Sequence, residues 1–201
     1  MQKIVISGIG TDVGKTVVSA IVAEYFKASY WKPVQSGDIE NSDSVKVKRL
    51  TENVTVLEEK YKLTEPLSPH ESARIDNVTI DINNFSIPEV NTNLIIEGAG
   101  GLMVPFNYDG DVYLDLFEKW NLPVIVVSRN YLGSINHTLL TVNALKQRNI
   151  PILGIIFSGE SNQASEKVIL AATKINCLAR IPEATELNKD FILEQAKKLN
   201  L

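Results

Sequence analysis

The segment KIVISGIGTDVGKTVVSAIVAEYFK (residues 3–27) joins an apolar run to a helical pattern through a glycine-rich turn. Residues 3–7 are rich in Ile and Val and lack strict alternation, which predicts a strand buried on both faces of a parallel sheet. Residues 15–27 place apolar side chains at helical spacing and predict a helix. A glycine-rich turn between such a strand and such a helix is typical of a phosphate-binding loop.

The spacing of this loop is unusual. The common pattern, a glycine, four residues and then Gly-Lys-Ser/Thr, requires a glycine where this chain has Ile9. We interpret the segment as a loop one residue longer, from Gly8 to Gly14. Lys15 would then reach the β- and γ-phosphates, and the Thr16 hydroxyl would bind Mg²⁺. The alternative is an ordinary strand-to-helix turn in which Lys15 is a solvated surface lysine.

Strands and helices alternate along the rest of the chain. Runs rich in Val and Ile recur at 93–97, 123–128 and 152–158, with a weaker run at 30–34. Helical spacing recurs at 134–147, 162–174 and 186–200. This order predicts an α/β domain of three layers, with a mostly parallel central sheet flanked by helices.

Residues 36–92 are less regular. They begin as a polar loop that becomes helical near Ser42, and residues 55–63 suit either a short helix or a strand. Pro66 and Pro69 predict a loop over 65–75. Since no repeat or linker interrupts the chain, we expect residues 1–201 to form a single domain.

Composition indicates which classes of partner the protein does not bind. The formal net charge of −4 does not suit a nucleic-acid surface, which is normally basic. No apolar stretch approaches the ~20 residues that cross a membrane, and the N-terminus lacks the apolar core of a signal peptide. The sequence therefore predicts a soluble cytoplasmic protein with neither a nucleic-acid nor a membrane partner.

Two carboxylates are candidates for binding Mg²⁺, which prefers oxygen ligands. Glu97 ends the run 93–97 and precedes the glycine-rich GAGG. Ligands of parallel sheets lie beyond the carboxyl ends of strands, so Glu97 is expected near the phosphate loop. The alternative is a strand-end glutamate that faces water. Asp43 follows Asn-Ser and suits a helix cap equally well.

Lys32 is a second candidate cation. It lies in the run 30–34 and precedes Pro33, so its backbone is expected to be extended. A lysine among buried apolar neighbours usually meets an anion. The alternative is an edge-strand lysine whose ammonium group extends into water.

Taken together, six stretches resemble the dethiobiotin synthetase family of P-loop NTPases. They are GTDVGKT (10–16), KPVQSG (32–37), NSD (41–43), EPLSPH (65–70), EGAGGLMVP (97–105) and LGSINHTLLT (132–141). They occur in the order of the family and span about two-thirds of the chain. The family's phosphate loop has the same longer spacing as the loop from Gly8 to Gly14.

The resemblance implies an activity. Members of this family close the ureido ring of dethiobiotin, in biotin biosynthesis, from 7,8-diaminononanoate, CO2 and MgATP. A carbamate forms first, ATP converts it to a carbamic–phosphoric anhydride, and ADP and phosphate are released. The family also implies a homodimer with substrate at the subunit interface.

The resemblance further implies roles for individual residues. Catalysis is expected from Lys15, Lys32 and Thr11. Nucleotide contacts are expected from Gly10, Thr11, Asp12, Val13, Gly14, Lys15, Thr16, Val17, Glu97, Ser158, Ile181, Pro182 and Glu183. Mg²⁺ ligands are expected from Thr16, Asp43 and Glu97. Substrate contacts are expected from Asp12, Lys32, Ser36 and, on the partner chain, Gly133, Ser134, Ile135 and Asn136.

The chain departs from the family at two places. Many members have Thr-Asp where this chain has Ile9-Gly10. Ser158 stands where members commonly carry an asparagine that reads the adenine edge. A serine hydroxyl cannot supply the paired donor and acceptor of an amide, so we expect weaker selectivity for ATP over other nucleoside triphosphates.

Two other functions compete with the synthetase: an amidoligase of the same ancestry and a switch ATPase of a different class. Amidoligases of the cobyrinic acid type usually carry a glutaminase domain with a cysteine nucleophile, for which this chain is too short. Partitioning-type switch ATPases usually carry an additional lysine early in the loop, where this chain has Ile9 to Asp12. Both remain alternatives to the synthetase.

Overall fold

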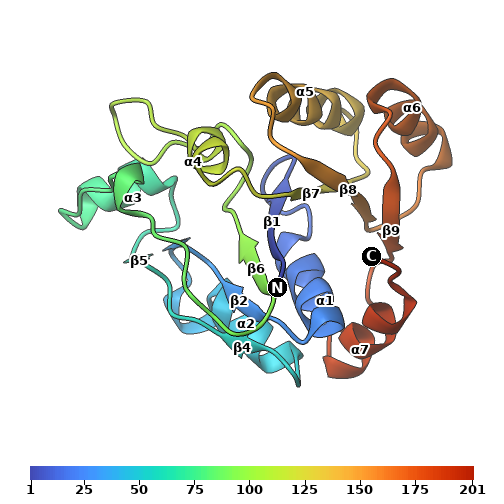
Figure 1. The fold of residues 1–201 in the computed structure, drawn as a ribbon, viewed down its shortest axis with the longest axis horizontal. Helices are drawn as coiled ribbons and strands as arrows, with labels where there is room; N and C mark the ends of the chain where they lie inside the picture. The colour runs from blue at the N-terminus through green and yellow to red at the C-terminus, as the bar shows by residue number, and fades with distance from the viewer.

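A computed structural model describes all residues, 1–201, and contains a central sheet of seven strands (Figure 1). The strands are ordered β4-β2-β6-β1-β7-β8-β9, and each neighbouring pair is parallel. Their bounds are β1 (Lys3–Gly8), β2 (Ser29–Trp31), β4 (Thr55–Val56), β6 (Leu94–Glu97), β7 (Val124–Arg129), β8 (Ile152–Ser158) and β9 (Cys177–Ile181). The prediction of a parallel central sheet is confirmed.

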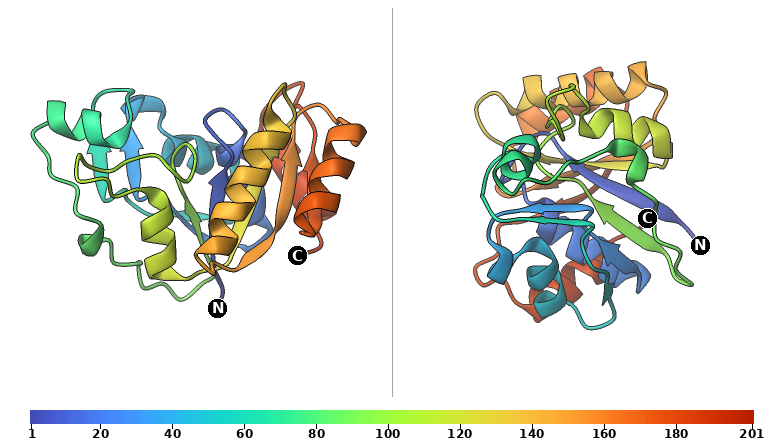
Figure 2. Two further views of the ribbon diagram at one scale, coloured as in Figure 1. Left: turned by 90° about the horizontal axis from the view of Figure 1, so that it is seen from above. Right: turned by 90° about the vertical axis from the view of Figure 1, so that its left-hand side faces the viewer.

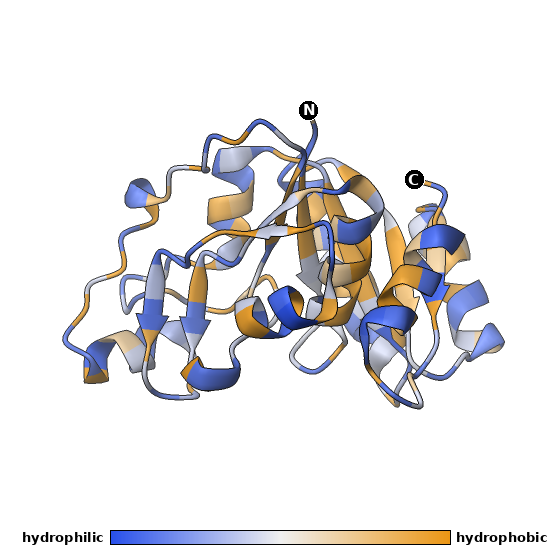
Figure 3. Ribbon diagram, turned by 90° about the horizontal axis from the view of Figure 1, so that it is seen from below, coloured by the Kyte–Doolittle hydropathy of each residue, from blue (hydrophilic) through white to orange (hydrophobic).

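Helices cover both faces of this sheet (Figure 2). One layer contains α1 (Lys15–Phe26), α2 (Asp43–Leu50) and α7 (Lys189–Lys198), which contact one another. The other contains α4 (Tyr113–Trp120), α5 (Ser134–Gln147) and α6 (Gln163–Thr173). Hydrophobic residues concentrate on the central strands, between the layers (Figure 3). Burial of these apolar side chains is the main force that holds the three layers together.

The run at 30–34 is not one strand, and that prediction is wrong. The chain leaves the central sheet after β2 and forms β3 (Val34–Ser36), which pairs with β5 (Tyr61–Leu63) in a separate sheet of two strands. Pro33 lies at the break, and proline has no N–H to donate to a strand ladder. Lys32 therefore directly follows β2 rather than lying inside a strand.

The predicted loop over 65–75 is also wrong in part, because it contains α3 (Pro69–Ile75). Ser68 is the N-cap residue and Pro69 occupies the first turn, where its missing N–H costs nothing. Residues 55–63, which suited a helix or a strand, form β4 and β5. The remaining short elements are two 3-10 turns, η1 (Ile39–Asn41) and η2 (Ile82–Asn84).

Two elements were absent from the sequence predictions. The helix α4 begins where the Asp115 carboxylate accepts a hydrogen bond from the Val112 N–H at 3.0 Å. The strand β9 is the edge strand of the sheet and is only half-buried over most of its length, so it lacks a continuous apolar run. None of the helices is both long and apolar enough to cross a membrane.

Candidate active site

The glycine-rich loop lies between β1 and α1, at the carboxyl edge of the sheet. A Cβ atom added at Gly8 would lie 2.6 Å from Val13 Cγ2, whereas a Cβ at Gly10 would meet nothing within 4 Å. Gly14 precedes α1 with a φ of 86°, a conformation that favours glycine. The structure thus requires glycine at the two ends of the longer loop, which explains the unusual spacing.

Lys15 is the first residue of α1 and is 7 % exposed. Its Nζ donates a hydrogen bond to the Gly10 carbonyl at 2.7 Å, so the side chain folds back across the loop. Burial lowers the pKa of Lys15 to about 8, because the negative charge of Glu97 offsets only part of the desolvation. Lys15 is therefore not the solvated surface lysine of the alternative interpretation.

Thr16 lies between the carboxylates of Asp43 and Glu97. Its Oγ1 lies 2.9 Å from Asp43 Oδ1 and 3.0 Å from Glu97 Oε1. Glu97 is 1 % exposed, so it is not a strand-end glutamate that faces water. One hydroxyl oxygen and two carboxylate oxygens are therefore close enough to bind one metal ion. These ligands fit Mg²⁺, which binds few protein oxygens and keeps several of its waters.

Lys32 also contacts both carboxylates. Its Nζ donates hydrogen bonds to Asp43 Oδ2 and, at 3.1 Å, to Glu97 Oε1. Burial alone lowers the pKa of Lys32, but Glu97 and Asp43 outweigh burial and raise it, so the ammonium group stays charged. For Asp43 the two effects have the opposite sign. Burial raises the pKa of the carboxyl group, but Lys32 outweighs burial, so the pKa of Asp43 is lowered. Lys32 is a buried, ion-paired lysine and does not extend into water.

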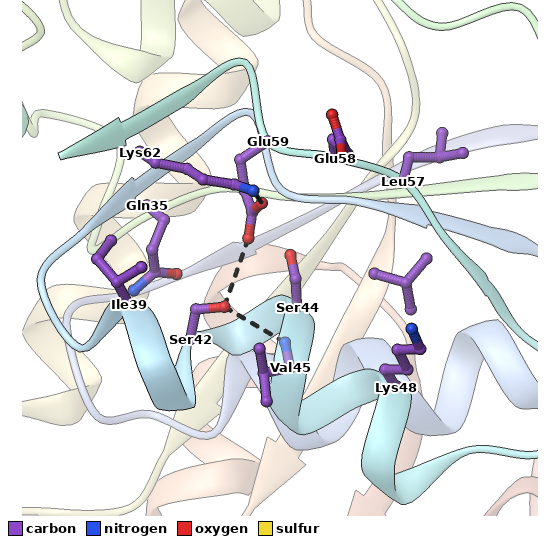
Figure 4. Close-up of a pocket in the computed structure, with 11 residues that line it drawn as sticks. Gln35, Ile39, Ser42, Ser44, Val45, Lys48, Leu57, Glu58, Glu59 and Lys62 are labelled. Atoms are coloured by element: carbon purple, nitrogen blue, oxygen red, sulfur yellow. Dashed lines mark hydrogen bonds and ion pairs between the residues drawn. The ribbon is translucent and has the colours of Figure 1, made fainter.

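The helix α2 carries Asp43 as its first residue, and Ser42 rather than Asp43 is its cap. The Ser42 hydroxyl accepts a hydrogen bond from the Val45 N–H at 3.3 Å (Figure 4). The Asp43 N–H donates to Gln35 Oε1 at 3.3 Å, which ties the start of α2 to β3. These contacts hold the Asp43 carboxylate toward Thr16 and Lys32. Figure 4 shows a hollow of about 200 Å³ beside the start of α2. Its lining does not include Lys15, Lys32, Asp43 or Glu97.

A larger cleft of about 830 Å³ gathers most of the predicted site residues. Its lining includes Thr11, Asp12, Gly14, Lys15, Thr16, Val17, Lys32, Ser36, Asp43 and Glu97. They come from the loop after β1, the first turn of α1, the residue after β2, the ends of β3 and β6, and the start of α2. Because the sheet is parallel, the carboxyl ends of its strands meet at one edge, where open sheets bind ligands.

The predicted nucleoside contacts lie farther along this edge. The Ser158 hydroxyl donates a hydrogen bond to the Val13 carbonyl at 2.6 Å, so it braces the glycine-rich loop. Ile181 pairs with Ser158 across β8 and β9. Pro182 and Glu183 line a neighbouring cavity of about 480 Å³.

Residues 133–136 do not line the cleft of their own chain. Gly133 precedes α5, and Ser134, Ile135 and Asn136 form its first turn. Gly133 and Ile135 line a separate cavity of about 400 Å³, away from both lysines. The structure therefore brings together the phosphate loop, Lys32 and the carboxylates, but not the start of α5.

Two side chains near the site were missed by the sequence analysis. Tyr30 is fully buried, and its hydroxyl donates a hydrogen bond to Glu97 Oε2 at 2.9 Å. Burial and the charge of Glu97 raise the pKa of Tyr30, so the phenol stays protonated. Arg129 ends β7, lines the cleft and forms an ion pair with Glu183 at 3.0 Å. A tyrosine inside an apolar strand is a signal for a polar partner, because a buried phenol needs one.

The fold resembles those of two solved structures. The septum site-determining protein MinD from Pyrococcus horikoshii, solved with Mg-ADP, is 14 % identical with a TM-score of 0.58, covering 98 % of this chain and 95 % of that one. A ParA family ATPase from Chlorobium tepidum is 12 % identical with a TM-score of 0.52, covering 98 % and 97 %. At these identities the likeness concerns the fold alone.

Sequence comparison is more specific. A protein family described as an AAA domain matches residues 2–190. ATP-dependent dethiobiotin synthetase BioD of Christiangramia forsetii is 51 % identical, covering 96 % of this chain and 93 % of that protein. The proteins of the same name from Rhodopseudomonas palustris and Agrobacterium fabrum are 46 % and 44 % identical, covering 93 % and 94 % of this chain and 90 % of each relative. With this identity over nearly its whole length, the chain belongs to the ATP-dependent dethiobiotin synthetase family.

Proposed function

We propose that this protein closes the ureido ring of dethiobiotin from 7,8-diaminononanoate, CO2 and ATP. The observation that carries the proposal is the group of two lysines, Thr16, Asp43 and Glu97 at the carboxyl edge of the sheet, in which both lysines and Glu97 are buried. This group can place positive charge around a transferred phosphoryl group. It occurs in a chain 51 % identical to a dethiobiotin synthetase.

The proposed reaction has three steps. A substrate amine adds to CO2, loses a proton and becomes a carbamate. A carbamate oxygen then attacks the γ-phosphorus of ATP, so that a new P–O bond forms and the bond to ADP breaks. Finally the second amine attacks the carbamoyl carbon and loses a proton, and the C–O bond to phosphate breaks as the ring closes.

The residues of the cleft act mainly through charge. Lys15 lies at the loop that would surround the phosphates, and Lys32 lies beside the two carboxylates. Fixed charges that face a developing negative charge stabilise the transition state without reorganisation. Thr16, Asp43 and Glu97 would hold Mg²⁺, which neutralises charge on the β- and γ-phosphates when bound. Since the carbamate is itself the nucleophile, no activated serine or cysteine is required.

Three polar residues of the cleft suit the substrate. Thr11 and Asp12 are exposed in the glycine-rich loop, and Ser36 lies at the end of β3. The Ser36 Oγ is buried and has no hydrogen-bond partner within the chain. A buried polar group without a partner is costly, which favours a contact to a bound carbamate or amine.

We further propose a homodimer in which the start of α5 completes the site of the partner chain. A helix N-terminus presents free N–H groups and favours an anion such as the substrate carboxylate. Leu132, which precedes the cap residue Gly133, is fully exposed, and Tyr131 is exposed beside it. Exposed apolar side chains at a helix start suit contact with a second chain.

The test is an endpoint assay with purified protein, MgATP, bicarbonate and 7,8-diaminononanoate, with products analysed by mass spectrometry. We expect a dethiobiotin mass, and phosphate release only when the diamine is present. Lys15→Ala should abolish both, because it removes a charge that faces the transferred phosphoryl group. Lys27→Ala, at an exposed lysine after α1, is the matched control. Phosphate release without the diamine would refute the proposal and favour a switch ATPase.

A further inference from the structure

Tyr30 occupies the centre of β2, which pairs with β6 on one side and β4 on the other. It lies opposite Ile95 in the register with β6, and its exposed fraction is 0 %. Its hydroxyl nevertheless reaches the carboxyl edge of the sheet and donates to Glu97 Oε2 at 2.9 Å. A neutral donor bound to a carboxylate makes a hydrogen bond stronger than one between two neutral groups.

The two oxygens of Glu97 have different surroundings. Oε2 accepts the bond from Tyr30, inside the sheet. Oε1 lies 3.0 Å from Thr16 Oγ1 and 3.1 Å from Lys32 Nζ, on the side of the cleft. The terminal torsion of a glutamate is broad and selects no single orientation by itself. The contact with Tyr30 therefore fixes the plane of the carboxylate, so that its second oxygen faces Thr16.

We propose that Tyr30 is a positioning residue that fixes the plane of the Glu97 carboxylate, with one oxygen directed at the magnesium site. This inference rests on the proposed function of Thr16, Asp43 and Glu97 as Mg²⁺ ligands. Tyr30 touches neither metal nor substrate, and acts only through the carboxylate. Groups that orient a metal ligand in this way typically contribute about 10–100-fold to metal affinity.

The experiment measures metal binding rather than turnover. Mn²⁺ replaces Mg²⁺ as a paramagnetic probe, and its affinity for the protein–ADP complex is read by electron paramagnetic resonance. ADP affinity in EDTA is measured by calorimetry on the same samples. Tyr30→Phe keeps the ring and removes one hydroxyl. The matched control is Tyr25→Phe, whose hydroxyl lies 3.4 Å from the carbonyl of the C-terminal Leu201.

We expect Tyr30→Phe to weaken Mn²⁺ binding by about 10-fold or more and to leave metal-free ADP affinity unchanged. A general loss of structure would instead lower both affinities. Tyr25→Phe should change neither. In the Glu97→Ala background, removal of the Tyr30 hydroxyl should have no further effect on Mn²⁺, because the residue acts through Glu97.

The outcomes separate this inference from the proposed function. If Glu97→Ala weakens Mn²⁺ binding but Tyr30→Phe leaves it unchanged, the role of Tyr30 is refuted and the magnesium site stands. An equal loss of Mn²⁺ and metal-free ADP affinity in Tyr30→Phe would also overturn it, in favour of a structural role. If Glu97→Ala leaves Mn²⁺ affinity unchanged, the proposed magnesium site itself is wrong.

Discussion

Lys15 and Lys32 are both buried, yet their surroundings act differently on the ammonium charge. Lys32 contacts two carboxylates, which raise its pKa despite burial. Lys15 contacts a carbonyl, and burial lowers its pKa to about 8. Lys32 therefore stays charged at every working pH, whereas the charge of Lys15 depends on pH and on bound phosphate.

This difference predicts how nucleotide affinity depends on pH. Bound phosphates favour the protonated form of Lys15, so the free protein must take up a proton once the pH exceeds about 8. We expect the Kd for ADP, measured by calorimetry in EDTA, to rise about tenfold per pH unit above that value. Lys15→Arg, which keeps its charge, should remove the dependence. A wild-type Kd that stays constant from about pH 7 to 10 would contradict this assignment.

Ser158 leads to a second prediction at this scale. Its hydroxyl donates its one proton to the Val13 carbonyl, so it has no donor left for a base edge. We expect the kcat/KM values for ATP, GTP and CTP to differ by less than about 100-fold, the range of a pocket without paired polar contacts. Ser158→Ala should lower all three in proportion, because it loosens the phosphate loop. A stronger preference for ATP would show that another residue reads the base.

At the scale of elements, the site depends on how helix starts are held against strand ends. Asp43 is the first residue of α2, and its direction follows from the Ser42 cap and the bond to Gln35. Glu97 ends β6, and Lys15 begins α1. Small changes in the start of α2 should thus affect magnesium binding without touching a ligand.

Ser42→Ala tests this coupling. Loss of an N-cap side chain costs about 1 kcal/mol of unfolding free energy, measured by urea denaturation. Asn188→Ala removes the equivalent cap from α7, where the side chain accepts from the Phe191 N–H. We expect similar destabilisation in both variants, but a higher Mg²⁺ concentration for half-maximal activity only in Ser42→Ala. An equal Mg²⁺ requirement in the two variants would mean that the cap does not position Asp43.

At the scale of the whole molecule, one chain holds the phosphate loop and the carboxylates in a single cleft but leaves the start of α5 outside it. A twofold dimer would bring the start of α5 from one chain to the cleft of the other. Each site would then need residues from both chains. Mixing of two inactive variants can test this arrangement.

Lys15→Ala and Asn136→Ala should each be inactive as pure proteins. Refolded together, half of the randomly formed dimers are mixed, and each contains one intact site. The mixture should regain about a quarter of the wild-type activity in the dethiobiotin assay. No recovery would mean that both residues serve the same site within one chain. Dilution below the dimer Kd should abolish activity. Sedimentation analysis at the same protein concentrations measures the fraction of dimer.

The sequence by itself determined β1, the phosphate loop and α1, because these depend on local periodicity and on glycines required by backbone geometry. It also indicated Lys15, Thr16, Asp43 and Glu97, which lie at strand ends or helix starts. Long apolar strands were predicted, whereas the half-buried β9 was not. The sequence predicts a loop where α3 forms, because Pro66 and Pro69 suit a turn as well as a helix start.

Only the tertiary structure decided the remaining contacts. Tyr30 bonds to Glu97 across 67 positions of sequence, and Ser158 to Val13 across 145. No local pattern encodes such a pair, since it arises when parallel strands align and bring distant side chains to one edge of the sheet. The same alignment buries Lys32 between two carboxylates and leaves Lys15 with a carbonyl. The sequence thus indicates which charged residues belong to the site, and the packing of the sheet determines which of them form ion pairs.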